Sequence, residues 1–384
     1  MLPISLALLV PNLNFIINNV FLGHLSEQAL ATASITGVYY LIFSMIGFGL
    51  NNGLQLLIAR RAGENRPEEI GKLFNQGVLL ALLLAIFSIA LTYTIASYIL
   101  EHTVHNPETY HQALSFLHIR IWGLPFLYIY QMRNALLIGI NESRLLVAGT
   151  LAEAVANVFF DYVLIFGQWG FPKLGFNGAA YASVIAEFIG MAVIFIVINA
   201  KGISKKYVLF KKLRVEVENV KLILRISGPL IFQLTISIIS WWGFYLLIEH
   251  HGRTSLAVSN TMRNVFGFFG IFIWAFAATA STMVSNLIGQ GKQEQVVPII
   301  KKIMQMSASI MVVVCIFINI FPRPLLSIYG QSEAFIEAAI PVLRLVSVAM
   351  VLMSVSAIWL SAVTGTGNSR MTFRIEMIAV LFYS

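Results

Sequence analysis

Long apolar stretches, separated by short polar ones, follow one another along almost the whole chain. A helix needs about 20 mainly apolar residues to cross a bilayer, and ten stretches reach this length. They lie at 2–22, 32–58, 74–100, 113–139, 145–166, 176–199, 226–249, 257–287, 302–322 and 337–363, and an eleventh begins near residue 372. The pattern predicts an all-α integral membrane protein.

Composition supports this fold class. The chain is 58% hydrophobic and 11% charged, whereas a soluble domain is about 45–50% apolar and about 25% charged. No basic segment and no small-residue cleavage site accompany the first apolar stretch, so we expect a spanning helix there rather than a signal peptide. The single cysteine, Cys315, lies in an apolar run and excludes a disulfide framework.

Basic residues alternate between the loops. Of the 25 Lys and Arg residues, 18 lie in or beside the loops that follow the second, fourth, sixth, eighth and tenth stretches. Because cytoplasmic loops are enriched in Lys and Arg, we predict that these loops and the N-terminus are cytoplasmic. The net charge of +8 therefore reflects topology, and no nucleic-acid partner is expected.

An internal repeat divides the chain. Gly63, in LLIARRAGENRPEEIGK, corresponds to Gly289, in TMVSNLIGQGKQEQVVP, and Gly139 corresponds to Gly365 at the same offset. Six spans separate the copies, so the repeat is parallel, as in some secondary transporters. We predict two six-helix bundles: an N-terminal lobe at 1–200, a basic cytoplasmic linker at 201–225, and a C-terminal lobe at 226–384. The second bundle stops after about ten and a half spans, and we expect twelve in the intact protein.

The fifth apolar stretch, TLAEAVANVFFDYVLIFG, carries Glu153, Asn157 and Asp161. Residues four apart lie about 40° apart around a helix, so the three form one polar stripe. A charge inside the bilayer is costly and marks an ion or substrate pathway by default. Asp161 either exchanges a proton or Na⁺ against substrate, or makes a structural helix–helix hydrogen bond, or lies at the outer interface. It is the only aspartate, which excludes an intramembrane aspartyl pair.

Other polar and aromatic residues in the spans allow two interpretations each. Glu187 is either an accessory or substrate-cavity residue or forms a structural ion pair, with Arg133 or Arg263 as its partner. Glu153 is either an accessory part of the stripe or a surface-level charge beside Arg144. Glu249 either ends a helix in solvent or lies at the mouth of a cavity. Trp241 and Trp242, in SWWGFY, either pack at the membrane interface or hold a cationic drug by cation–π contact.

Cofactor motifs are missing from the sequence. Its histidines come from separate loops without metal-binding spacing, and no GxGxxG or P-loop pattern occurs. We therefore expect no cofactor and no metal beyond a bound Na⁺ at Asp161 and Asn157.

In three sequence motifs the chain resembles the multidrug and toxic compound extrusion (MATE) transporters of the bacterial NorM-like type. The motifs are NNVFLGHLSEQALATAS, LIARRAGENRPEEIGK and NVFFDYVLIFGQWGFPKLGFNGAAYAS. The resemblance implies two bundles around a V-shaped central cavity in the bacterial inner membrane. It also implies a cation-coupled antiporter, not an enzyme, that exports amphipathic or cationic drugs in exchange for Na⁺ or H⁺. We expect it to be a monomer.

The resemblance assigns ion-coupling residues as well. Asp161 and Asn157 match the family's fifth-span pair, and Ser183 falls where the sixth span supplies a hydroxyl ligand. Asn18 stands where the family's first span has an aspartate. An amide can ligate Na⁺ through its oxygen, but it carries no proton at working pH. Other subfamilies carry acids in the seventh and tenth spans. The seventh span here has none before Glu249, and the tenth has none over 343–363, so coupling should depend on the first lobe.

Other functions stay open at this point. A lipid-linked oligosaccharide flippase of a related superfamily would have a strongly cationic cavity, whereas most cations here lie in the predicted cytoplasmic loops. An intramembrane enzyme would need a catalytic set at one depth. A non-transporting scaffold would leave a costly intramembrane carboxylate without a role. These considerations favour drug export.

Overall fold

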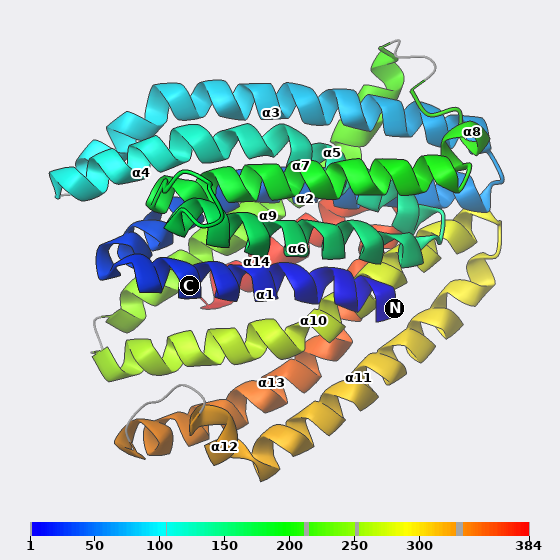
Figure 1. Cartoon of the computed structure of the whole chain (residues 1–384). Coiled ribbons are helices and arrows are strands. Elements are labelled where there is room, and N and C mark those ends of the chain that lie inside the picture. Colours follow the sequence, from blue (N-terminus) through cyan, green and yellow to red (C-terminus); the bar gives the residue numbers. More distant parts are fainter. Residues whose placement is uncertain (1, 105, 211–214, 250–252, 328–332, 384) are drawn as a thin grey trace.

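The computed structural model describes residues 2–104, 106–210, 215–249, 253–327 and 333–383 (Figure 1). Within these ranges only the backbone is described at residues 2, 7–16, 27, 30–31, 241–247, 249, 253–257, 260 and 383. Every element in this part of the chain is a helix. The predicted all-α fold is therefore confirmed.

The helices follow the predicted apolar stretches and extend beyond most of them. In the first half they are α1 (Leu2–Leu25), α2 (Glu27–Gly63), α3 (Pro67–Thr103), α4 (Pro107–Arg120), η1 (Ile121–Gly123), α5 (Leu124–Gly139), η2 (Ser143–Leu145), α6 (Leu146–Phe166) and α7 (Phe176–Ala200). In the second half they are α8 (Ile203–Lys206), α9 (Val217–Glu249), α10 (Arg253–Gly289), η3 (Gln293–Gln295), α11 (Val296–Ile320), α12 (Pro322–Ser327), α13 (Glu333–Gly365) and α14 (Ser369–Tyr383).

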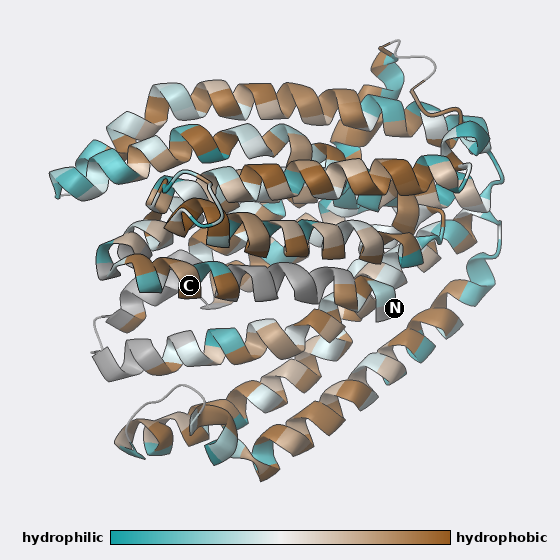
Figure 2. Cartoon of the chain, viewed as in Figure 1, coloured by the Kyte–Doolittle hydropathy of each residue, from teal (hydrophilic) through white to brown (hydrophobic). Residues whose placement is uncertain are grey.

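Apolar length makes this a multi-pass membrane protein. Within the described residues, nine stretches from α2 to α13 are long and apolar enough to cross a membrane. Figure 2 shows hydrophobic residues along the helices and hydrophilic residues gathered at many of the turns and helix ends, including the α2–α3 and α10–α11 turns and α8. We call the end of the bundle where these three segments lie the basic end.

Local sequence signals set several helix ends. The Ser26 side chain accepts a hydrogen bond from the Ala29 amide at 3.0 Å and caps α2. Asn106 caps α4 in the same way and is followed by Pro107, which suits the first helical position. Gly167 ends α6 with a left-handed φ of 71°, a conformation that glycine adopts without penalty.

The repeat predicted from the paired glycines is visible in the helix boundaries. The offset of 226 relates the last residues of α2 and α10, Gly63 and Gly289, and it also relates the last residues of α5 and α13, Gly139 and Gly365. The turns repeat too: left-handed Asn65 (φ 57°) corresponds to Gly291 (φ 74°), and Asn141 (φ 63°) to Gly367 (φ 91°). Asparagine and glycine are the residues that adopt this conformation most readily. We call α1–α7 the first repeat and α9–α14 the second repeat.

A matched pair of glycines joins the two repeats at the basic end. A Cβ at Gly63 would overlap the carbonyl oxygen of Asn286, and a Cβ at Gly289 would overlap the carbonyl oxygen of Arg60. Asn286 is itself the repeat counterpart of Arg60. The two contacts are therefore one contact, made twice around a pseudo-two-fold axis, and only glycine lets the backbones approach this closely.

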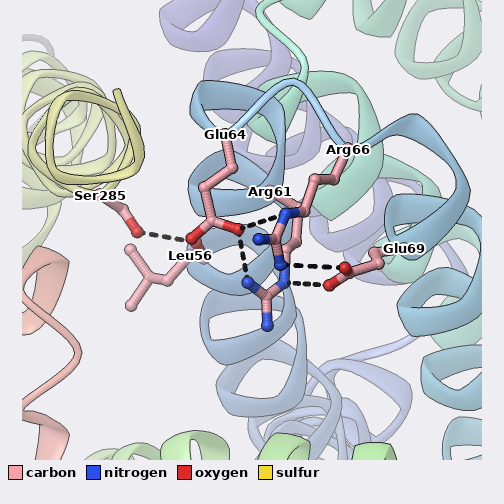
Figure 3. Close-up of polar contacts among 6 residues, drawn as sticks. All are labelled: Leu56, Arg61, Glu64, Arg66, Glu69 and Ser285. Carbon is pink, nitrogen blue, oxygen red and sulfur yellow. Dashed lines mark hydrogen bonds and ion pairs between the residues drawn. The ribbon is translucent and has the colours of Figure 1, made fainter. Parts of the chain in front are cut away.

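Hydrogen bonds cross between the repeats beside the glycine pair, which we call the glycine contact. The Ser285 hydroxyl donates to the Leu56 carbonyl at 2.8 Å (Figure 3). The Asn286 amide donates to the Ala59 carbonyl at 3.0 Å, and Arg60 donates to the Thr366 carbonyl at 2.8 Å. The repeats are thus closed against each other at the basic end.

Charged side chains interlock over the adjacent turn. Arg61 pairs with Glu64 at 2.5 Å and with Glu69 at 2.8 Å, and Arg66 pairs with Glu69 at 3.1 Å (Figure 3). Because these groups are partly exposed, the pairs contribute little stability individually. Their effect is to hold the α2–α3 turn in one shape beside the glycine contact.

The segment predicted as a basic linker at 201–225 is packed against the first repeat. Tyr207 and Leu209 are buried, and the Phe210 amide donates to the Asn75 side chain of α3 at 3.0 Å. α9 already begins at Val217, inside the predicted linker. The division at 1–200, 201–225 and 226–384 stays a prediction.

Candidate ion-coupling site

Asp161 lies on α6 and is completely buried. The side-chain amide of Asn18, on α1, lies 2.8 and 3.2 Å from the two carboxylate oxygens. A carboxylate only accepts hydrogen bonds, so we assign the amide nitrogen to this side, where it donates to both oxygens. Hydrogen bonds to an ionised group are the strong ones. The contact therefore ties α1 to α6 at the carboxylate.

Asn157 lies one turn before Asp161 on the same helix and is 6% exposed. Its side-chain nitrogen is buried and has no hydrogen-bond partner among the described residues. Leaving such a group unpaired costs about 1–3 kcal/mol. The amide can therefore turn over without losing a hydrogen bond, and it can present its oxygen to a cation.

Ser183 lies on α7 and is half-buried. Within the described part of the chain its hydroxyl makes no hydrogen bond to Asp161, Asn157 or Asn18. Its role as a ligand stays a prediction.

Glu153, at the other end of the stripe, is half-buried against α7. A Cβ at Gly190 would lie 2.9 Å from the Glu153 Cβ and 3.2 Å from its Oε2, so the glycine makes room for the carboxylate. Among the described residues Glu153 has no hydrogen bond and no ion pair. It interacts electrostatically with Glu187 and Arg120.

Glu187 forms a buried ion pair, but the predicted partners were wrong. Arg120, not Arg133 or Arg263, donates to it: Nη1 to Oε2 at 2.9 Å and Nη2 to Oε1 at 2.6 Å. The two side chains are 13% and 7% exposed. Removing one partner from a buried pair destabilises a protein by about 3–5 kcal/mol, because the other charge is left uncompensated.

Arg133 is occupied elsewhere. It donates to the Met191 carbonyl, and its guanidinium carbon lies 4.9 Å from the centre of the Phe195 ring. Arg120 stands in HIRIWG, near the start of the apolar stretch predicted at 113–139. Arg120 is the last residue of α4, and the short helix η1 follows it directly. Gly123 makes room for the Arg120–Glu187 pair, because a Cβ there would lie 2.5 Å from Arg120 Nη1 and overlap Glu187 Oε2.

One carboxylate was missed by the sequence interpretation. Glu376, on α14, accepts a hydrogen bond from the Ser237 hydroxyl of α9 at 2.9 Å. It is a lone acid in the apolar run FRIEMIAV, which was the signal available. The side chains of Trp241, Trp242 and Glu249 lie outside the described part of the structure, so their assignment to a substrate cavity stays a prediction.

A cavity of about 500 Å³ lies at the basic end, between the α2–α3 turn, the α5–α6 turn and α10. Arg66, Asn141, Asn286 and Gln290 are among its lining residues, and no residue of the Glu153–Asn157–Asp161 stripe lines it. This cavity is therefore distinct from the carboxylate site.

A known protein-family profile matches the chain in two segments. The MatE family profile matches residues 3–163 and again residues 229–383. The first residues of the two matches are related by the same offset as Gly63 and Gly289. The chain belongs to the MatE family.

Curated relatives agree with this membership. The probable multidrug resistance protein NorM of Thermotoga maritima is 24% identical over 371 residues, which are 94% of this chain and 77% of that protein. The multidrug resistance protein MdtK of Proteus mirabilis is 23% identical over 95% of this chain and 80% of that protein. This chain is thus a member of a multidrug efflux transporter family.

Solved structures share the fold. A point mutant of the Vibrio cholerae MATE transporter VcmN superposes with a TM-score of 0.91 at 15% identity, over 99% of this chain and 85% of that one. A multidrug resistance MATE transporter in an outward-facing conformation superposes with a TM-score of 0.89 at 18% identity, over 99% of this chain and 84% of that one. At these identities the likeness establishes the fold alone, and it confirms the two-bundle MATE architecture.

Proposed function

We propose that this protein is a secondary antiporter that exports amphipathic or cationic small molecules in exchange for Na⁺ or H⁺. It would act in the bacterial inner membrane, with its N-terminus and basic end in the cytoplasm. The coupling group is Asp161, supported by Asn18 and Asn157, with Ser183 as a further ligand. The observation that carries the proposal is a fully buried carboxylate whose described hydrogen bonds come only from the amide of another helix.

The Asn18 amide can bind the Asp161 carboxylate both when it is empty and when it holds a proton or Na⁺. Toward ionised Asp161 it presents its nitrogen, as described above. Toward a protonated carboxyl or a bound Na⁺ it would present its oxygen after a half-turn of the amide. The same side chain can therefore satisfy both states, although it carries no charge of its own.

The closed basic end suits one of the two states that alternating access requires. The glycine contact and the hydrogen bonds beside it seal the repeats together at that end. Opening this contact, while the opposite end closes, would give the other state. Export follows when the driving ion and the exported molecule bind the two states with different affinities.

Transport by the full chain tests the proposal. The protein is reconstituted into liposomes, and movement of ethidium, an aromatic cation, is followed by fluorescence under a Na⁺ gradient, a pH gradient or neither. We expect ethidium to move against its own gradient when one cation gradient is imposed and to stop when that gradient is collapsed. Ethidium movement that ignores both gradients would contradict ion-coupled antiport.

A further inference from the structure

The Arg120–Glu187 pair is held from several sides. The two-pronged contact with Glu187 uses both terminal nitrogens of Arg120. The guanidinium carbon lies 3.7 Å from the centre of the Tyr40 ring, and the Tyr40 hydroxyl donates to Glu187 Oε1 at 3.1 Å. Gly123 leaves space for both charged ends. α2, η1 and α7 thus fix the guanidinium in one place within the first repeat.

The position of the Arg120 guanidinium affects the carboxylates of the stripe. Glu187 lies one helical turn before Gly190, the residue of α7 that packs against the Glu153 side chain of the stripe. Arg120 pairs with Glu187 and also interacts electrostatically with Glu153 and Asp161. Three carboxylates therefore interact with one cation, and only Glu187 binds it directly. Glu153 and Asp161, on the stripe, have no cationic partner in direct contact among the described residues.

From this arrangement we propose that Glu187 is a positioning residue for ion coupling. It neutralises Arg120 and keeps the guanidinium away from the stripe, so that Asp161 and Glu153 stay available to a transported cation. The proposal rests on the proposed antiport, and it adds a residue that does not itself bind the ion. A guanidinium without its counter-ion would repel an incoming Na⁺ or H⁺ and would compete with it for the carboxylates.

Changes at the two partners should have opposite effects. Glu187→Gln leaves an unpaired positive charge beside the stripe, and the half-saturating concentration of the driving cation should rise about tenfold, the lower end of what a neighbouring charge does. Arg120→Met leaves an additional negative charge, and that concentration should fall. The double variant Arg120→Met/Glu187→Gln removes both charges and should return within about threefold of the wild type. A purely structural pair predicts damage of the same sign from either change.

The experiment uses the full chain reconstituted into liposomes, with ethidium as the transported probe. Initial rates are measured against Na⁺ at fixed pH, or against pH without Na⁺, whichever gradient drives the wild type. In the pH series the other ionisable side chains around this pair are Tyr40, Tyr128, Tyr130, Glu153 and Asp161, so the double variant serves as their reference. Glu333→Gln is the matched control, because it breaks an Arg–Glu contact to Arg323 whose partners are 61% and 63% exposed.

The outcomes separate the two proposals. Opposite shifts for the single variants, rescue in the double variant and no shift in Glu333→Gln support the positioning role. If Glu187→Gln does not fold, a lowered half-saturating concentration in Arg120→Met still supports it, and an unchanged or raised one overturns it. Shifts of the same sign, or no rescue, overturn it too. A wild type without any cation dependence overturns the antiport itself.

Discussion

Replacing Gly63 by alanine should open the basic end of the transporter. The added methyl group would overlap a backbone carbonyl, that of Asn286 on α10. A backbone oxygen cannot rotate away as the tip of a flexible side chain can, so α2 and α10 must separate. Gly289→Ala makes the same overlap with the Arg60 carbonyl and should give the same result.

The size of the effect follows from the hydrogen bonds that this separation would break. Three of them cross between the repeats within two turns of Gly63, at 2.8, 3.0 and 2.8 Å. Each contributes about 1 kcal/mol net, so the closed state should lose about 2–3 kcal/mol. This corresponds to a shift of about 30- to 150-fold in the ratio of closed to open molecules.

Distances between spin labels on the two repeats measure this ratio. Exposed Glu68 and Glu294, which are repeat counterparts, carry the labels as cysteines after Cys315 is changed to serine. Gly63→Ala should move most of the distance distribution to longer values. Gly228→Ala is the control, because its Cβ would meet nothing within 4 Å. A distribution identical to that of the wild type in Gly63→Ala would refute the glycine contact as the closure of the basic end.

Three further changes probe stability, each through the midpoint of thermal unfolding of the purified protein. Gly123→Ala crowds the buried ion pair and should destabilise by about 1–3 kcal/mol, the range for overpacking. Gly267→Ala is the control and should not destabilise, because its Cβ would meet nothing within 4 Å. Equal unfolding midpoints for Gly123→Ala and Gly267→Ala would contradict the crowding at Gly123. Asn18→Leu should cost about 1.5–3 kcal/mol, because it removes the hydrogen bonds to buried Asp161. Adding Asp161→Leu should restore most of that stability, and a further fall would argue against the pairing. Asn106→Ala should lower stability by about 1 kcal/mol through loss of the α4 cap; no change would show that the cap is dispensable.

Hydropathy alone predicted the helices, because a span is defined by a long apolar run and needs no knowledge of its neighbours. The repeat was equally accessible, since the glycines that revealed it, Gly63 and Gly289, are the residues whose small size the inter-repeat contact requires. The stripe on α6 followed from helical periodicity. What these features share is that each is encoded locally or by a fixed offset.

Pairings between distant side chains were not accessible in this way. Arg120 stands in HIRIWG at the edge of an apolar run and looks like a loop cation, and its partner Glu187 lies much later in the chain, on α7. Asn18 was connected with Asp161 only through the family resemblance, because nothing in either segment reports that α1 packs on α6. Glu376 was passed over for the same reason, since its hydrogen bond comes from Ser237 of another helix.

Transport by the Asp161→Asn variant tests the central claim most directly. The substitution keeps the size of the side chain and removes the only aspartate of the chain. Everted membrane vesicles containing equal amounts of the wild type or the variant are given ethidium and the driving cation gradient. We predict that the wild type accumulates ethidium and that the variant does not, although it is folded and present at the same level. Accumulation by the variant at the wild-type rate would contradict the assignment of Asp161 as the coupling group.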